Sequence, residues 1–176
     1  NNGAKIITSD SNDEYDYVFF CNHPNEVTNI GKNLSNNQND VLKGIKYSKN
    51  EVVLHKDSSI MPRNYKCWAS WVYKKTKNNQ PILSYWMNSL QEIDKKHPIF
   101  VSLNPQDQIR EDKIFNRHVL EHPLFDITAR KAQNLMPLIQ GENNSFFCGA
   151  YNKYGFHEDG VVSSIKAVEK LKSIDL

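Results

Sequence analysis

The stretch SFFCGAYNKYGFHEDGV, residues 145–161, decides the fold. It begins with an apolar run that ends at Gly149, which is typical of a buried strand. A loop with further glycines follows, and an amphipathic helix is expected to begin at about Asp159. Such a loop directs unpaired backbone N–H groups and the positive end of a helix dipole toward whatever lies above the strand. The pattern therefore predicts a site for an anion or an electron-rich ring.

The same residues also have a purely structural interpretation. Asp159 or Glu158 would cap the helix and complement its dipole, while Gly149 and Gly155 would only make a turn. Spacing alone does not choose between a binding loop and a capped turn, so both interpretations stay open.

The closing helix has the clearest periodicity in the sequence. Apolar residues recur at three- and four-residue steps, and charged residues take the opposite face. The apolar set is Val161, Val162, Ile165, Val168 and Leu171, and the charged set is Lys166, Glu169, Lys170 and Lys172. This pattern predicts an amphipathic helix.

Working outward, residues 15–21 (YDYVFFC) are a second apolar run and predict a strand buried on both faces. A polar turn over residues 9–14 separates it from a short β-compatible run at residues 5–8. Pro24 suits the first turn of a helix that follows the strand. Residues 33–40 are expected to form an Asn-rich loop before a short helical segment at residues 41–45.

The middle third is rich in short β-branched and aromatic runs with turn residues between them, which predicts an antiparallel sheet. The expected strands are residues 52–55, 67–73, 82–87 and 99–103. The lysine-rich segment around residues 74–81 is interpreted as a solvated hairpin turn. A further strand at residues 115–120 and a helix at residues 126–139 lead to the closing stretch.

These elements predict a mixed α/β (α+β) fold in which Rossmann-like pieces flank a block of antiparallel strands. The expected domains are residues 1–47, a strand and a helix of the first domain, then residues 48–125, a β-rich inserted domain. Residues 126–176 would return the chain to the first domain.

Charge and cysteine content limit the possible partners and setting. The formal net charge is +2 and the basic residues are dispersed, so no nucleic-acid partner is expected. Cys21, Cys67 and Cys148 lack CxxC spacing, which argues against a disulfide framework and a zinc site and favours a cytoplasmic setting. No apolar run approaches the roughly 18 residues of a membrane span.

The closing stretch resembles the C-terminal flavin-binding motif of the FAD-dependent amine oxidase and desaturase superfamily. Gly155, Phe156, His157 and Glu158 match its Gly-aromatic-x-Glu pattern in register. Asp159 and Ser164 stand where glycines are usual in that motif.

Several further blocks are similar to bacterial NAD/FAD-binding proteins of the amine-oxidase-like group, which are related to the oxidase-like region fused to plant cyclopropane fatty acid synthases. The similarity runs from about Tyr15 to Leu171. The matching blocks, in order, are Leu54-His55-Lys56-Asp57, Met61-Pro62-Arg63, Trp68-Ala69-Ser70-Trp71, Tyr85-Trp86-Met87-Asn88, Ser102-Leu103-Asn104-Pro105, His122-Pro123 and Ala132-Gln133.

The resemblance implies an FAD-binding domain with an inserted β-rich substrate domain, and hydride transfer from a small, lipid-like substrate to FAD. It assigns no catalytic residue. The implied cofactor-binding residues are Gly149, Ala150, Tyr151, Gly155, Phe156, His157, Glu158, Asp159, Gly160 and Val161. The family's GxGxxG turn is absent from this sequence, so the resemblance also implies a missing N-terminal half, upstream or on a separate chain.

Alternatives to the flavoenzyme remain. One is a non-catalytic remnant or interaction module that binds no flavin alone, and another is a small-molecule binding domain that uses the loop for a phosphate or carboxylate. His118 and His122 have the spacing of helical zinc ligands but lie in a strand-like segment, so no metal site is predicted. Trp68, Trp71 and Trp86 would line either an apolar substrate pocket or an aromatic core.

Overall fold

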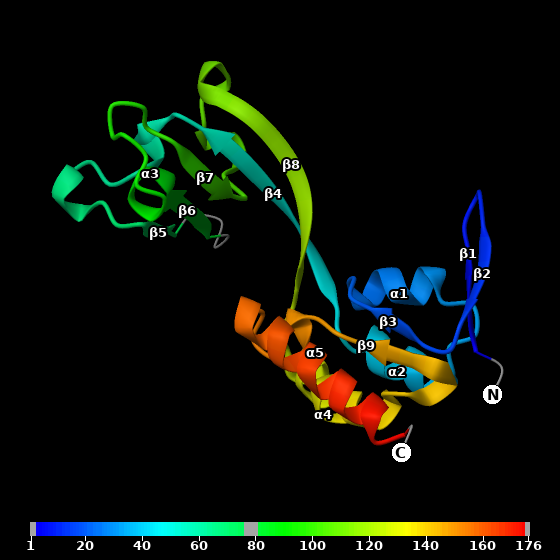
Figure 1. The fold of residues 1–176 in the computed structure, drawn as a ribbon. Coiled ribbons are helices and arrows are strands. Elements are labelled where there is room, and N and C mark those ends of the chain that lie inside the picture. The colour runs from blue at the N-terminus through cyan, green and yellow to red at the C-terminus, as the bar shows by residue number, and fades with distance from the viewer. Residues whose placement is uncertain (1–2, 76–80, 175–176) are drawn as a thin grey trace. The chain divides into compact units, whose positions relative to one another are not determined.

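The computed structural model describes residues 3–75 and 81–174, which form two compact units (Figure 1). The split unit consists of Asn1–Ser48 together with Pro123–Leu176, and the inserted unit is Lys49–His122. The chain thus leaves one unit, builds a second and returns to the first. The sequence analysis placed the domain boundaries after residues 47 and 125, and the structure divides after residues 48 and 122. The fold class is the expected mixture of helices with an antiparallel sheet.

The split unit is built around a short parallel strand pair. Its elements are β1 (Ala4–Ile7), β2 (Asn12–Tyr15), β3 (Val18–Phe20), α1 (Pro24–Ile30), α2 (Asn36–Lys43), α4 (Ile127–Ile139), β9 (Ser145–Phe147) and α5 (His157–Lys172). Strands β1 and β2 form an antiparallel hairpin. Strand β3 pairs in parallel with β9, so that Phe19 lies beside Phe146 and Phe20 beside Phe147.

The two faces of the β3–β9 pair carry separate apolar cores. On one face Phe147 packs with α1, α2 and α4 through residues such as Val27, Leu42 and Met136. On the other face Phe146 and Cys148 pack with α5. Because both faces are covered, β9 is buried along its length, whereas β3, predicted as a strand buried on both faces, is only half-buried.

Two loop expectations in the first 50 residues were wrong. The predicted turn at residues 9–14 contains the start of β2, which pairs with β1. The predicted loop at residues 33–40 contains the first half of α2. The Ser35 hydroxyl accepts the Gln38 N–H at 3.0 Å, and the Gln38 side chain accepts the Ser35 N–H at 3.0 Å. This reciprocal capping box starts the helix within an Asn-rich segment.

The orientation of α5 also differs from its apolar periodicity. Val161, Ile165 and Val168 are 54%, 52% and 42% exposed, whereas Ser163 and Ala167 are buried against β9. Small side chains on this face let the helix approach the strand closely. An apolar stripe of Val161, Ile165 and Val168 is therefore left on the outside of the helix.

The inserted unit holds a five-stranded sheet in the order β5-β6-β7-β4-β8. Its strands are β4 (Tyr47–His55), β5 (Trp71–Lys74), β6 (Ile82–Trp86), β7 (Phe100–Leu103) and β8 (Ile114–Pro123), and a short helix, α3, spans Met87–Leu90. The pairs β5–β6, β6–β7 and β7–β4 are antiparallel, as expected. The strand predicted from residue 67 begins only at Trp71, because Tyr65–Cys67 form a 3-10 turn. The predicted hairpin turn lies largely at residues 76–80, outside the described residues.

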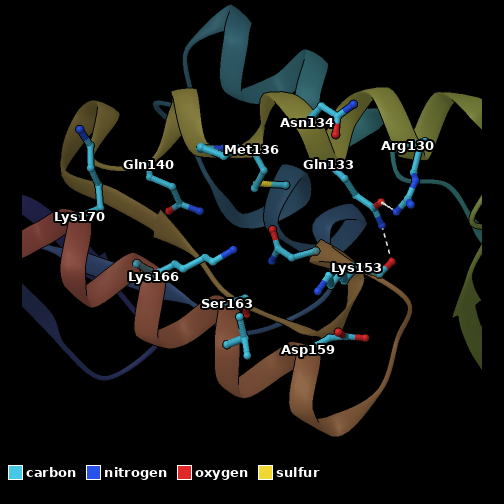
Figure 2. Close-up of a pocket in the computed structure, with 14 residues that line it drawn as sticks. Arg130, Gln133, Asn134, Met136, Gln140, Lys153, Asp159, Ser163, Lys166 and Lys170 are labelled. Carbon is cyan, nitrogen blue, oxygen red and sulfur yellow. Dashed lines mark hydrogen bonds between the residues drawn. The ribbon is translucent and has the colours of Figure 1, made fainter.

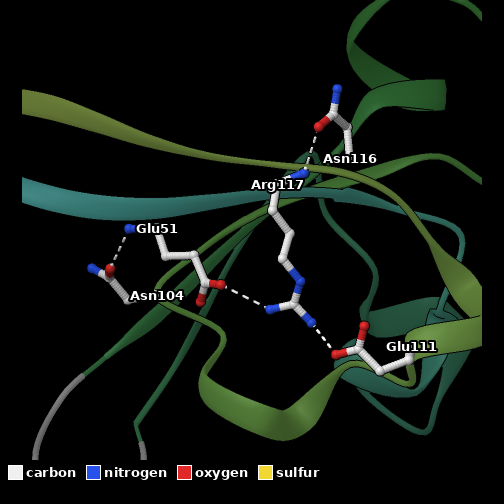
Figure 3. A network of polar contacts seen from close by, with 5 residues as sticks. All are labelled: Glu51, Asn104, Glu111, Asn116 and Arg117. Atoms are coloured by element: carbon white, nitrogen blue, oxygen red, sulfur yellow. Dashed lines mark hydrogen bonds and ion pairs between the residues drawn. The ribbon is translucent and has the colours of Figure 1, made fainter.

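An ionic cluster joins β4 to the start of β8 (Figure 3). The Arg117 guanidinium donates to the Glu51 carboxylate at 2.8 Å, and its other amino group donates to Glu111. The Glu51 backbone N–H also donates to the Asn104 side chain at 3.0 Å. These contacts link the edge strand β8 to β4 and to the segment that precedes β8.

One face of this sheet forms a core that contains a buried histidine. The His55 Nδ1 atom accepts the Asp57 backbone N–H at 3.1 Å, so its Nε2 atom carries the proton and donates to Ser102 Oγ at 2.9 Å. The Ser102 hydroxyl is also 2.7 Å from that of Ser84. Because the histidine donates to the serine, this chain of side chains does not activate a nucleophile. Burial lowers the pKa of His55 from 6.5 to about 4, against smaller opposing effects of Asp57.

This pKa predicts a loss of stability in weak acid. Between pH 6.5 and about 4 the unfolded chain protonates His55 and the folded chain does not, so the free energy of unfolding falls as the pH is lowered. The contribution lost by pH 4 is on the order of 3 kcal/mol. Urea unfolding of the wild type and of His55→Gln at pH 7 and pH 4.5 checks it. The variant should lack this part of the pH dependence, and equal pH dependence in both proteins would show that His55 is not its source.

Candidate functional site

The predicted binding loop begins where β3 and β9 both end. The parallel pairing extends by one residue, since the Cys148 N–H donates to the Phe20 carbonyl at 2.9 Å. After Gly149 the chain makes a 3-10 turn, Ala150–Asn152, and then reaches the first residue of α5, His157. The carboxyl ends of parallel strands are where open α/β sheets bind ligands. The loop therefore occupies the expected place for a site.

A buried hydroxyl ties the start of this loop to α5. Ser163 Oγ accepts the Gly149 N–H at 2.9 Å and donates to the Gly160 carbonyl at 2.7 Å. The Asn152 side chain donates to the Gly149 carbonyl at 3.0 Å. Both backbone groups of Gly149 are thus satisfied within the loop and helix, which fixes the strand end relative to α5.

Gln133 of α4 holds the other side of the loop, and Gln140, the residue after α4, holds the end of β9. The Gln133 side chain donates to the carbonyls of Tyr151 and Lys153, at 2.9 and 2.6 Å. The Gln140 side chain exchanges two hydrogen bonds with the backbone of Phe147, each 2.9 Å long, as a neighbouring strand would. Sequence reasoning gave neither Gln140 nor Ser163 a role.

Asp159 caps the loop and α5 together. Its carboxylate accepts the N–H groups of Tyr154 and Phe156, both at 3.1 Å. The first N–H groups of α5 that donate to a preceding carbonyl are those of Asp159 and Gly160, and both donate to the Phe156 carbonyl. The N–H groups of His157 and Glu158 come before these bonds, at the open amino end of the helix. The capping interpretation is therefore correct, and it leaves amides available to a ligand.

The glycines of the loop and of the first turn of α5 differ in how strongly the structure requires glycine. Gly155 has φ of +91°, in the left-handed region, and an added Cβ would lie 3.2 Å from the Phe125 ring. A Cβ on Gly149 would lie 2.4 Å from the buried Tyr151 ring. A Cβ on Gly160 would meet nothing nearer than the Ala150 nitrogen at 3.6 Å.

The predicted cofactor-binding residues do not all face one space. The Tyr151 side chain points into the core that contains Val27 and Phe147, and burial raises the pKa of its phenol. Phe156, His157, Glu158 and Val161 are exposed. Tyr151 can therefore contact a ligand at the loop only through its backbone groups.

A cavity of about 600 Å³ lies between α4 and α5, beside this loop (Figure 2). Its polar walls carry Arg130, Gln133, Asn134, Gln140, Asn152, Lys153, Asp159, Ser163, Lys166 and Lys170, and its apolar lining comes from Met136, Pro137, Val162 and Ala167. Sequence reasoning did not predict this cavity. The four-residue spacing of Lys166 and Lys170 places both on one face of the helix, but nothing in the sequence shows that α4 lies opposite.

The tryptophans and histidines singled out in the sequence have separate positions. Trp86 is buried and Trp68 packs against its core, whereas Trp71 is 60% exposed. His118 and His122 lie on strand β8, so the spacing of helical metal ligands does not apply to them. Across residues 3–75 and 81–174, no group of three or more acidic, histidine or cysteine side chains could hold a metal ion.

The three cysteines carry free thiols. The register of β3 with β9 brings Cys21 beside Cys148, which the sequence distance did not suggest. Burial raises the pKa of the Cys148 thiol to about 11, with smaller effects of Cys21. Within the described part of the chain, none of the helices has the length and apolar character needed to cross a bilayer. The cytoplasmic setting stays a prediction.

Comparison with known proteins adds one piece of information about the fold. The chain resembles a CLA-producing fatty acid isomerase from P. acnes in fold, with a TM-score of 0.58 and 12% sequence identity. The match covers 96% of this chain and 44% of the isomerase chain, so this chain spans less than half of that structure. No protein-family model and no curated protein sequence matches the chain.

We expect Ser163→Ala to lower the free energy of unfolding by about 1 kcal/mol, because the half-buried Gly149 N–H loses its acceptor. Ser164→Ala is the matched control, since that residue is exposed and its hydroxyl donates to the Gly160 carbonyl at 3.0 Å without contacting the Gly149 N–H. Chemical denaturation measures both. Equal, small effects of the two substitutions would contradict a special role for Ser163.

Exposure and pKa also predict thiol reactivity. At pH 7.5 a thiol reagent should label Cys21 and Cys67 in the folded protein and reach Cys148 only after unfolding, because Cys148 is buried and its thiol stays protonated. Peptide mass spectrometry identifies the labelled sites. Rapid labelling of Cys148 without denaturant would mean that the end of β9 opens readily.

Proposed function

We propose that this chain is the C-terminal segment of an FAD-dependent oxidoreductase, in which the loop after β9 contacts the flavin ring. The observation that carries the proposal is the meeting of two parallel strand ends with the open amino end of α5. The resemblance of residues 155–158 to the flavin-binding motif of the amine oxidase superfamily supports it. The likeness to the fatty acid isomerase supports the fold on which it depends.

The chain's own residues fit the ring contact. The N–H groups of His157 and Glu158 are free of helical bonds, and the capping by Asp159 holds them in place beforehand. Preorganised N–H donors stabilise negative charge that develops nearby. A bound flavin would accept a hydride from the substrate, and these donors would face its electron-rich edge.

The residues do not fit the diphosphate of FAD in the usual way, because the sequence contains no GxGxxG turn. We propose that a missing N-terminal half supplies it. The stripe of Val161, Ile165 and Val168 on α5 would give such a half an apolar surface to cover. A match that covers 44% of the isomerase chain agrees with a larger complete protein.

A lipid-like substrate is the proposed substrate class, and the open face of the inserted sheet supports it. The register places two cross-strand rows on this face, and every member is apolar or aromatic and at least partly exposed. The rows are Trp71–Tyr85–Val101–Leu54 and Tyr73–Leu83–Leu103–Val52. An antiparallel sheet that faces only water usually carries polar residues on that side. The name of the structural neighbour, a fatty acid isomerase, agrees with this substrate class.

A non-catalytic interaction module is the second candidate. The same exposed apolar face and the apolar stripe of α5 would then bind another protein, and the loop would be only a capped turn. The two candidates differ in whether flavin binds at the start of α5.

Replacing one backbone donor tests the flavin contact. His157 is the first residue of α5 and Phe156 before it is extended, with φ −83° and ψ 157°, so His157→Pro removes an N–H without a conflict of backbone conformation. His157→Ala keeps the N–H and is the matched control. In a titration followed by flavin fluorescence and visible absorption, we expect the wild type and His157→Ala to bind FAD saturably and His157→Pro to bind about tenfold more weakly.

Two results would contradict the proposal. Binding of FAD by His157→Pro with the affinity of the control would exclude the amide contact. The absence of any flavin binding by the wild-type chain would contradict a flavin contact made by this chain alone.

Aromatic residues of the open sheet face test the substrate class. We expect Trp71→Ser with Tyr73→Ser to weaken binding of a fluorescent long-chain fatty acid by about tenfold, since two large apolar surfaces are lost. Tyr65→Ser is the control, because Tyr65 is similarly exposed and belongs to neither row of the open face. Equal losses in the control would indicate non-specific adsorption.

A further inference from the structure

The cavity between α4 and α5 has an excess of positive charge. Four cationic side chains line it, Arg130 from α4, Lys153 from the loop, and Lys166 and Lys170 from α5. Asp159 is the one acidic residue in the lining. Its carboxylate already accepts two backbone N–H groups of the loop, so it serves as a cap for α5.

The lysines of this cavity have no acidic partners among the described residues. In residues 3–75 and 81–174 the ion pairs within 4.0 Å belong to Arg110 and Arg117, which lie in the inserted unit. Lys166 and Lys170 are four residues apart, and like charges at this helical spacing repel. In Figure 2 Lys170 rises from α5 toward α4, and Lys166 extends into the space between the two helices. This repulsion would be relieved by an anion between the helices.

Arg130 is held in a fixed position at the opposite wall. Its guanidinium donates to Gln133 Oε1 at 3.1 Å and to the Tyr154 hydroxyl at 2.9 Å, and it lies over the Tyr154 ring at 5.0 Å. Gln133 in turn holds the carbonyls of Tyr151 and Lys153. The cationic wall is therefore connected to the loop after β9 by direct hydrogen bonds.

The remaining lining selects the kind of anion. Met136 and Ala167 are buried, and with Pro137 and Val162 they give the cavity an apolar part. A volume of about 600 Å³ lies within the usual range for small-molecule sites, roughly 300–1,000 Å³. Several separate cations favour a phosphate, which has more charge and more acceptor oxygens than a carboxylate.

We propose that the α4–α5 cavity binds a small organic phosphate, with the phosphate between Lys166, Lys170 and Lys153 and the organic part on Pro137 and Val162. This site is separate from the proposed flavin contact at the amino end of α5. Because Gln133 joins its wall to the loop, an occupied cavity would also restrain that loop.

Calorimetric titration of the 176-residue chain with phenyl phosphate, inorganic pyrophosphate and benzoate tests the proposal. We expect saturable binding of both phosphates and weaker binding of benzoate. Lys166→Gln combined with Lys170→Gln should weaken the binding of phenyl phosphate by at least about tenfold. This double variant should be no less stable to heat than the wild type, because a like-charge pair is removed.

Lys172→Gln is the control, to be compared with Lys166→Gln and Lys170→Gln singly, since each removes one positive charge from the same helix and Lys172 lies outside the cavity. An equal loss of phosphate binding in Lys172→Gln would show that the net charge of the protein, and not the cavity, determines binding, and would overturn the site. Binding of benzoate as tight as phenyl phosphate would overturn the phosphate preference. Vesicles of phosphatidylglycerol that bind the wild type and not the double variant would assign the phosphate to a lipid headgroup. Flavin binding is measured separately, so failure of either proposal leaves the other distinguishable.

Discussion

The parallel pairing of β3 with β9 is the contact on which the rest of the structure depends. It joins residues 18–20 to residues 145–147, and the whole inserted unit lies between them in the chain. Each strand has three residues, so the backbone hydrogen bonds alone would not hold the pair. The stability must come from the stacked phenylalanines, Phe19 on Phe146 and Phe20 on Phe147, which divide the unit into two cores. The pairing also determines where the loop after β9 begins.

That loop is shaped mainly by hydrogen bonds between its backbone and side chains of α4 and α5. Ser163 holds the strand end, Gln133 holds the loop carbonyls, and Asp159 holds the last N–H groups before α5. Because these contacts are fixed, the backbone amides at the amino end of α5 are already in position and need not reorganise when a ligand binds. A site built in this way depends little on the identity of His157 or Glu158, whose side chains are exposed.

Much of the order of elements was predictable, because long apolar runs and capping residues are local signals. Pro24, Asp126 and the run at 145–149 each indicated the correct helix or strand. The start of α2 was missed because an Asn-rich composition outweighed the Ser35 and Gln38 capping box. Hydrophobic periodicity indicated the helix α5, of whose apolar residues Val162 and Leu171 are partly buried, but it could not show that Ser163 and Ala167 lie deepest, because their small size allows close packing. The α4–α5 cavity depends on contacts between distant segments and has no local signal.

The central claim is that the strand ends and the start of α5 form one flavin-contacting surface. Backbone amide NMR of the ¹⁵N-labelled chain during titration with FAD tests it most directly. The account predicts that the largest shift changes fall on the amides of His157 and Glu158 and on the loop that follows Gly149. Changes confined to residues elsewhere, with these amides unmoved at saturation, would contradict it.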